Sequence, residues 1–288
     1  GKVVKSEQVA TDFSVSNCVV LWGHNPQATI PPHAWQMLKG KAKGLKLIVV
    51  DPRYNQLAAK ADLWLRVKPA TDDALALGWL NVIVKEKLYD TSFVENWTNA
   101  PFLIRKDTGR SLREAEIKAG GSRDNFVVWN DKSNAPAVYD SSTMGYKVAD
   151  VKPALAGVYK VRLVGGEKVE CETVWQRLMA QVEQYTPQRV AEITWVEPEQ
   201  IVAAARMYAT SKPAALTTHM GIAMNTNSIQ TSRALSMLIT ITGNLDVDGG
   251  NVFAQYPAAG YLEFRKTLRC SPEVEKKTIG AAEFPLLA

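Results

Sequence analysis

The stretch Val19-Val20-Leu21-Trp22-Gly23-His24-Asn25-Pro26, residues 19–26, decides the fold, because an apolar run passes directly into a glycine turn. A second turn of this kind, HMGIAMN at residues 219–225, also follows an apolar run and leads towards a helix. An α/β sheet holds phosphorylated nucleotides with such turns, at the carboxyl ends of its strands. Two loops with charged tips lie between them, VVDPR at 49–53 and KPATDD at 68–73. We predict that the four loops line one long ligand site.

The apolar segments around these loops predict a doubly wound, mostly parallel, Rossmann-like α/β sheet. Strands are expected at 18–22, 46–50, 63–67 and 214–218. Helices are expected at 31–43, 56–60, 72–85, 91–97, 172–183, 198–210 and 228–241. The all-apolar run at 18–22 is typical of a strand buried on both faces of a parallel sheet.

Two segments depart from this pattern. From about residue 100 to 170, glycines, asparagines and short alternating runs replace long helical periodicity, which predicts a β-rich insertion of surface hairpins. From about residue 245, glycine and proline predict extended chain. We therefore expect an α/β domain over residues 1–250 and, over 251–288, an extended tail that leads into a next domain.

Composition narrows the class of ligand. With 46% hydrophobic and 22% charged residues, the chain is globular and not disordered as a whole. A net charge of +5 favours anionic partners, but the basic residues are scattered. This balance suits a phosphate-bearing small molecule better than nucleic acid, which we do not expect as a partner. No apolar stretch reaches the roughly 18 residues of a membrane span, so no span is expected.

Neither cysteines nor histidines form a recognisable metal motif. The three cysteines, Cys18, Cys171 and Cys270, are widely separated. A lone cysteine is more often a small buried apolar residue than a nucleophile. The three histidines match no ligand spacing that is typical of a metal site.

The loop tips carry groups that suit a nucleotide. Gly23 lets backbone N–H groups approach a phosphate. Asp51 can accept hydrogen bonds from ribose hydroxyls, and Arg53 can pair with a phosphate. An alternative of equal weight for Asp51 and Arg53 is that they form only a surface turn, with the arginine in solvent. The two oxygens of Asp72 match the paired N–H donors of guanine, although Thr71 and Asp72 are also common helix caps.

In this order, the motifs resemble the molybdopterin oxidoreductases of the dimethyl sulfoxide reductase family. The resemblance covers residues 15–99 and 172–253, including the stretches LWGHNP at 21–26, IVVDPR at 48–53, PATD at 69–72, TGN at 242–244 and GGN at 249–251. The insertion at 100–168 is similar to one found in part of the family, including acetylene hydratase-like members.

The resemblance implies a molybdenum or tungsten ion held by two molybdopterin guanine dinucleotides, one of which this chain binds and orients. It assigns cofactor-binding residues to the first loop (Trp22, Gly23, His24, Asn25, Pro26, Gln27), the second (Asp51, Pro52, Arg53), the guanine loop (Ala70, Thr71, Asp72) and a loop nearer the pterin (Met220, Gly221). Ala70 stands where many members have glycine, which makes that turn sterically more demanding.

The resemblance also implies what lies outside this sequence. The metal ligand and the cysteines of a 4Fe-4S cluster are expected upstream, and Cys18 matches a strand position with its sulfur in the sheet. We therefore expect no catalytic or metal-binding residue here, and a central fragment that is inactive alone. Its partners would be the remaining domains of the parent enzyme and an electron-transfer subunit. The compartment is left open between the cytoplasm and periplasm of a prokaryote.

Two other classes compete with this interpretation. A nicotinamide or flavin nucleotide-binding module would carry G-x-G-x-x-G after the first strand, where this sequence has GHNPQA at residues 23–28. The third hypothesis is a non-catalytic structural subunit that keeps the fold but holds no nucleotide.

Overall fold

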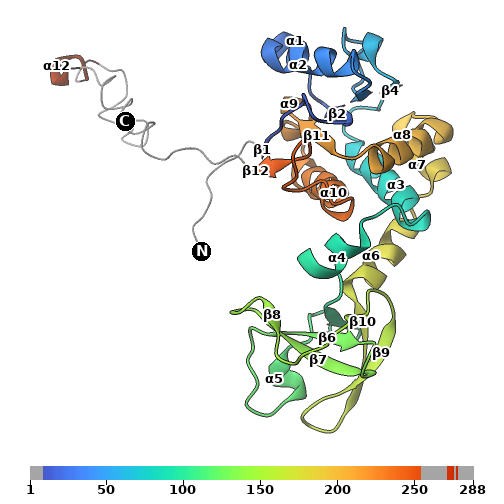
Figure 1. Ribbon diagram of the computed structural model, residues 1–288, viewed down its shortest axis with the longest axis vertical. Coiled ribbons are helices and arrows are strands. Elements are labelled where there is room, and N and C mark those ends of the chain that lie inside the picture. The colour runs from blue at the N-terminus through green and yellow to red at the C-terminus, as the bar shows by residue number, and fades with distance from the viewer. Residues whose placement is uncertain (1–8, 254–270, 276, 278–288) are drawn as a thin grey trace. The chain divides into compact units, whose positions relative to one another are not determined.

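A computed structural model describes residues 9–253, 271–275 and 277 (Figure 1). The chain divides into two units, residues 11–252 and the two ends, 1–10 together with 253–288. The first unit carries every loop named above. In the ends, the structure describes short strands and one turn of helix, β1 (Val9–Ala10), β12 (Val252–Phe253) and α12 (Pro272–Glu275). Most of the predicted extended tail, 251–288, lies outside the described residues.

A four-stranded parallel sheet forms the centre of the first unit. Its strands run in the order β11 (Ala214–Thr218), β2 (Cys18–Trp22), β3 (Lys46–Val50) and β4 (Leu63–Leu65). Neighbouring strands are paired in parallel throughout. The predicted strands are therefore confirmed, except that β4 ends two residues early.

Helices cover both faces of this sheet, as the doubly wound prediction requires (Figure 1). On one face, side chains from alternate strand positions such as Val19, Leu21 and Val49 pack against Met37 of helix α2 (Pro31–Lys41). On the opposite face, Val20, Ile48 and their neighbours join a larger apolar cluster. Its helical side chains come from α3 (Asp72–Lys85), α8 (Pro198–Thr210) and α10 (Ser228–Ile241). Period-two alternation sends successive side chains to opposite faces, so both faces of the same strands are buried.

The helices follow the predicted apolar periodicity closely. They are α1 (Pro26–Thr29), α2 (Pro31–Lys41), α3 (Asp72–Lys85), α4 (Thr91–Trp97), α5 (Glu114–Ile117), α6 (Val174–Glu183), α7 (Pro187–Thr194), α8 (Pro198–Thr210), α9 (Met220–Ala223) and α10 (Ser228–Ile241), with a 3-10 turn η1 (Ala58–Lys60). Four short helices, α1, α5, α7 and α9, were not predicted from the sequence. Helix α6 begins two residues later than predicted, because residues 172 and 173 complete strand β10 (Lys168–Thr173).

Cys18 lies fully buried in the larger apolar cluster, which agrees with a strand position inside the sheet. Burial raises the pKa of its thiol to about 12, so the sulfur stays protonated and unreactive at neutral pH. No group of histidine, cysteine and acidic side chains in the described part of the chain could hold a metal ion. None of the described helices is long and apolar enough to cross a membrane.

The insertion consists of two small antiparallel sheets. One has the order β5 (Leu103–Arg105), β10 (Lys168–Thr173), β9 (Val158–Arg162), and the other the order β6 (Phe126–Asn130), β7 (Ala135–Asp140), β8 (Gly145–Tyr146). They enclose a separate apolar cluster that includes Leu103, Val127 and Cys171. The predicted surface hairpins therefore have a buried core of their own.

A buried carboxylate ties this insertion together. The side chain of Glu114 is 3% exposed and lies 2.7 Å from the Lys147 ammonium. It also accepts a hydrogen bond from the Asn125 amide over 2.8 Å. These donors, with Lys147 first, lower the pKa of Glu114 to about 2. A pKa that is lowered on folding adds stability above the unfolded value, which is lost as the pH falls towards the folded one.

We therefore expect the insertion to lose stability between about pH 4.5 and pH 2, as Glu114 takes up a proton. Glu114→Gln should be less stable than the wild type at pH 6 and should lose less stability between pH 5 and pH 3. Urea unfolding followed by circular dichroism at each pH measures both effects. Glu167→Gln, at an exposed position, is the control. An unchanged pH dependence in Glu114→Gln would contradict the assignment.

Candidate functional site

The carboxyl ends of the four parallel strands lie in one row. Thr218 pairs with Trp22, Trp22 with Val50, and Val50 with Leu65, so each strand reaches the edge at the same level. The four predicted loops leave the sheet from this row. They are therefore at one edge of the sheet, as the sequence predicted, although they are separated by up to two hundred residues in the chain.

Direct contacts join these loops to one another. The backbone N–H of Gly23 donates to the Val50 carbonyl over 2.9 Å, and that of Asp51 donates to the Leu65 carbonyl over 3.2 Å. The N–H of Gly221 donates to the Gly23 carbonyl over 3.1 Å. The edge is thus a hydrogen-bonded unit rather than a set of independent loops.

The two glycine turns touch backbone to backbone. A Cβ atom added to Gly221 would lie 2.6 Å from the Gly23 carbonyl oxygen and 2.7 Å from its Cα. Gly23 itself has a φ of +59°, in the left-handed region. Both positions therefore need glycine, Gly23 for its conformation and its contact, and Gly221 for its contact.

This contact lies where the winding of the sheet reverses. The chain runs from β2 outward to β3 and β4, and later returns to add β11 on the other side of β2. Ligands of open α/β sheets bind outside the carboxyl ends of the strands at such a switch point. The site expected from topology alone is therefore the gap between the loops after β2 and β11, where Gly23 and Gly221 meet.

Two histidine rings stack at the same point. The rings of His24 and His219 are 5.1 Å apart with an interplanar angle of 17°. His24 is buried and its Nδ1 lies 3.0 Å from the hydroxyl of Thr217, whereas its Nε2 has no hydrogen-bond partner among the described residues. Burial, followed by the charges of His219 and His33, lowers the pKa of His24 to about 4, so its imidazole is neutral at pH 7.

Asp72 is buried at the first turn of α3 and is bonded to the first loop. The indole N–H of Trp22 donates to Oδ1 of Asp72 over 2.8 Å. Neither Thr71 nor Asp72 caps the helix with its side chain, because the Thr71 hydroxyl donates to the Lys68 carbonyl instead. The capping alternative is therefore wrong for these side chains. Burial raises the pKa of Asp72, and the Trp22 bond opposes that rise.

Asp51 organises its own turn. Its carboxylate accepts from the backbone N–H of Arg53 over 2.8 Å and from the Asn55 amide over 3.3 Å. Arg53 is exposed and makes no ion pair within the described residues. A cavity of about 370 Å³ lies beside it, lined by residues of the first two loops, including Asn25, Gln27 and Tyr54. A guanidinium that has no ion-pair partner among the described residues and lies next to a cavity can pair with an anion.

The guanine loop contains a strained residue. Ala70 has a φ of +65° and is exposed. An L-residue pays about 1–2 kcal/mol for this left-handed conformation, whereas glycine adopts it without steric cost but loses about 0.5–1 kcal/mol more entropy on folding. The steric cost that we expected for an alanine in place of glycine at this turn is therefore present in the structure.

Ala70→Gly should therefore raise the free energy of unfolding by about 0.5–1 kcal/mol, which is the balance of these two terms. The midpoint of urea unfolding measures the change. Ala59→Gly, in η1 where the φ is ordinary, is the matched control and should lower the free energy of unfolding by about 0.5–1 kcal/mol. A loss of stability in both variants would contradict the strain at Ala70.

The structure adds residues that the sequence analysis did not select. Thr217 and His219 lie at the switch point, and Tyr54 and Asn55 line the cavity beside Arg53. His219 opens the second glycine turn, so its position in the motif was an available signal. Nothing in the sequence marks Thr217, because its role depends on strand pairing. The cofactor-binding assignments of the predicted residues themselves stay predictions.

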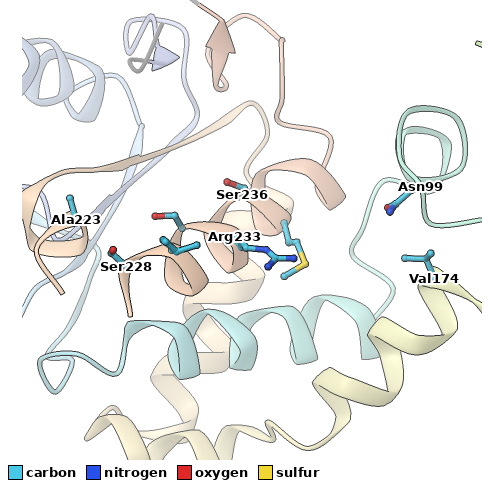
Figure 2. A pocket seen from close by; sticks show the side chains of 9 residues that line it. Asn99, Val174, Ala223, Ser228, Arg233 and Ser236 are labelled. Atoms are coloured by element: carbon cyan, nitrogen blue, oxygen red, sulfur yellow. The ribbon is translucent and has the colours of Figure 1, made fainter. Parts of the chain in front are cut away.

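A larger cavity, of about 770 Å³, lies along α10 (Figure 2). Ser228, Ser232, Arg233 and Ser236 of α10 line it, together with Asn99 and Val174. In Figure 2 the Arg233 side chain extends towards the wall formed by Asn99 and Val174. Ala223, from the loop after β11, also lines it, so the cavity reaches one of the four loops, although no predicted cofactor-binding residue lies on its wall.

Comparison with known proteins identifies relatives of most of the chain. The molybdopterin oxidoreductase family matches residues 3–276. The perchlorate reductase subunit alpha of Dechloromonas aromatica (strain RCB) is 33% identical over 84% of this chain and 29% of that protein. The dimethylsulfide dehydrogenase subunit alpha of Rhodovulum sulfidophilum is 36% identical over 78% of this chain and 25% of that protein.

Among solved structures, acetylene hydratase from Pelobacter acetylenicus is similar with a TM-score of 0.51 and 26% identity, over 81% of this chain and 22% of that one. This likeness agrees with the family that the sequence motifs indicate. The chain thus spans less than a third of the length of each of these relatives. The family's cofactor is molybdopterin with molybdenum. By its sequence and its fold, the chain belongs to the molybdopterin oxidoreductase family.

Proposed function

We propose that the four-loop edge binds the guanine dinucleotide end of a molybdopterin cofactor and thereby orients the pterin end within a longer enzyme. The observation that carries this proposal is the level row of strand ends from Thr218 to Leu65, which brings the four loops to one edge at the switch point.

The residues present fit such a group. The paired glycines 23 and 221 leave no Cβ atom between the loops after β2 and β11. Asp72 is buried with one oxygen on Trp22, and no side chain of the described residues bonds its Oδ2. A carboxylate in this state suits a ligand that presents N–H donors, as guanine does. The cationic Arg53 suits a phosphate.

These contacts indicate separate roles for the bound cofactor and for this chain. When bound, the cofactor supplies the metal that changes oxidation state. Asp72, Arg53 and the glycine turns bind the distant nucleotide end, and binding energy there positions the reacting end. The metal ligand, the iron–sulfur cluster and the reaction itself would belong to the rest of the parent enzyme. We further propose that the remaining domains and an electron-transfer subunit are its partners.

Calorimetry with guanosine diphosphate and with NAD on the purified chain tests the proposal. We expect heat from guanosine diphosphate at concentrations where NAD gives none. Preference for NAD would favour a nicotinamide nucleotide module, and binding of neither nucleotide, with the fold intact by circular dichroism, would favour a structural subunit.

A further inference from the structure

The indole of Trp195 is exposed although its backbone is strained. Trp195 ends helix α7 with a φ of +65°, in the left-handed region that helix ends usually give to glycine or asparagine. Its side chain is 62% exposed, so packing within the described residues does not account for a bulky aromatic residue there. Strained residues of this kind concentrate at functional sites.

Trp195 lies beside the loop at residues 68–73, which carries Asp72. The backbone N–H of Lys68, at the start of that loop, donates to the Thr194 carbonyl over 2.8 Å. Helix α8 follows Trp195, packs against the sheet and leads to the start of β11, so its own first turn lies at the edge where the parallel strands end. The Lys68 ammonium lies over the indole, 5.3 Å from the ring centre. Trp195 is therefore a neighbour of the third loop at the carboxyl edge of the sheet.

The order of the loops along the edge directs a nucleotide base towards Trp195. The strands run in the order β11, β2, β3 and β4, so the loop after β4 lies at the outer end of the row. A nucleotide with its phosphate at Gly23, after β2, and its ribose at Asp51, after β3, extends its base towards the loop after β4. Asp72 of that loop is the buried carboxylate that suits the N–H donors of guanine. Trp195 borders the same end of the row.

A purine has a polar rim and two flat faces, and each needs a different partner. A carboxylate such as Asp72 accepts from N–H groups on the rim but leaves the faces uncovered. Every base has a π face that stacks on an aromatic side chain. Tyr54 is also exposed at this edge, but it belongs to the loop after β3 and stands edge-on against Trp64. The exposed aromatic ring that borders the loop of Asp72 is the indole of Trp195.

We propose that the indole of Trp195 is the stacking platform for the guanine base of the bound nucleotide. This inference rests on the proposed function of the edge. Asp72 reads the rim of the base and Trp195 holds one of its faces. The base takes the ring face from the Lys68 ammonium, because a cation–π contact at an exposed site is weak compared with base stacking.

The test uses the full-length parent enzyme, purified without its cofactor and titrated with guanosine diphosphate in a calorimeter. Trp195→Ala should weaken binding at least tenfold, whereas Trp195→Phe should keep most of the affinity because it keeps a flat aromatic ring. A base stacked on an indole also quenches its fluorescence. Guanosine diphosphate should therefore quench the wild-type enzyme more strongly than Trp195→Phe, a difference that a purely structural role of the indole would not produce.

Trp195→Gly separates binding from folding. Glycine adopts the left-handed conformation without steric cost, so this variant should resist urea better than Trp195→Ala. It should nevertheless bind guanosine diphosphate as weakly as Trp195→Ala, since both lack the ring. Trp35→Ala is the matched control, because Trp35 of α2 is 58% exposed and has the Lys39 ammonium 3.6 Å from its ring centre. Its affinity should equal that of the wild type.

Three results would overturn the inference while leaving the proposed function intact. They are wild-type affinity in Trp195→Ala, equal quenching in Trp195→Phe and the wild type, and an equal loss of affinity in Trp35→Ala. Wild-type affinity together with a less stable full-length Trp195→Ala enzyme would show that the indole packs against another domain instead. Failure of the wild-type enzyme to bind guanosine diphosphate would overturn the proposed function itself.

Discussion

Full-length enzyme that carries Asp72→Asn is expected to retain a tenth or less of the guanine nucleotide found in the wild type. The substitution keeps Oδ1, which accepts from Trp22 over 2.8 Å, so the tie between the first and third loops can survive. It replaces the second oxygen with an N–H₂ donor, which would face a guanine donor. Loss of a charge-assisted bond costs about 1.5–3 kcal/mol, and about 1.4 kcal/mol corresponds to a factor of ten in affinity.

Release of guanosine monophosphate per mole of enzyme measures this effect. Glu86→Gln, just past the other end of α3 in an exposed ion pair with Arg206, is the control and should retain nucleotide fully. Trp22→Phe tests the tie separately, because it removes the indole donor but leaves the carboxylate. Wild-type nucleotide content in Asp72→Asn would show that this carboxylate does not bind the ligand.

Gly221→Ala is expected to have the largest effect on stability among the loop positions. Its new Cβ would lie 2.6 Å from the Gly23 carbonyl oxygen and 2.7 Å from the Gly23 Cα, both backbone atoms that no rotamer change can move away. Overpacking of this kind costs about 1–3 kcal/mol. The displaced turn would also separate the loops after β2 and β11, so nucleotide affinity should fall together with stability.

The free energy of urea unfolding and the titration of guanosine diphosphate measure the two losses in the same preparation. Gly165→Ala is the matched control, because nothing lies within 4 Å of its added Cβ, and it should change neither quantity. Gly221→Ala with wild-type stability would mean that the two turns do not touch in solution.

The sequence predicted the sheet well for a physical reason. The run at 18–22 is apolar at every position because β2 is buried on both faces, and such a run leaves little alternative to an internal parallel strand. The fold class and the family are accordingly confirmed. The periodicity of α3 and α10 identified them in the same way, since the side chains that face the sheet recur along each helix.

The parts that the sequence could not give depend on tertiary pairing. The stacking of His24 on His219 joins residues almost two hundred positions apart, and only the parallel pairing of β11 with β2 brings them together. The bond from Trp22 to Asp72 also depends on tertiary pairing, because the parallel pairing of β2, β3 and β4 brings the two loops to one edge. A motif can name Asp72 as a candidate, but whether it caps a helix or faces a ligand is decided by what is packed around it.

The level alignment of the strand ends has a consequence for how this domain can vary in length. An extra residue inside β2 or β3 would advance its loop by about 3.3 Å and turn its apolar side chains to the opposite face. Insertions should therefore be excluded from the strands and accumulate where they leave this row unchanged. The segment between β5 and β10 has an apolar cluster of its own. Tens of residues can be added or lost there without moving the carboxyl ends of the four parallel strands out of line.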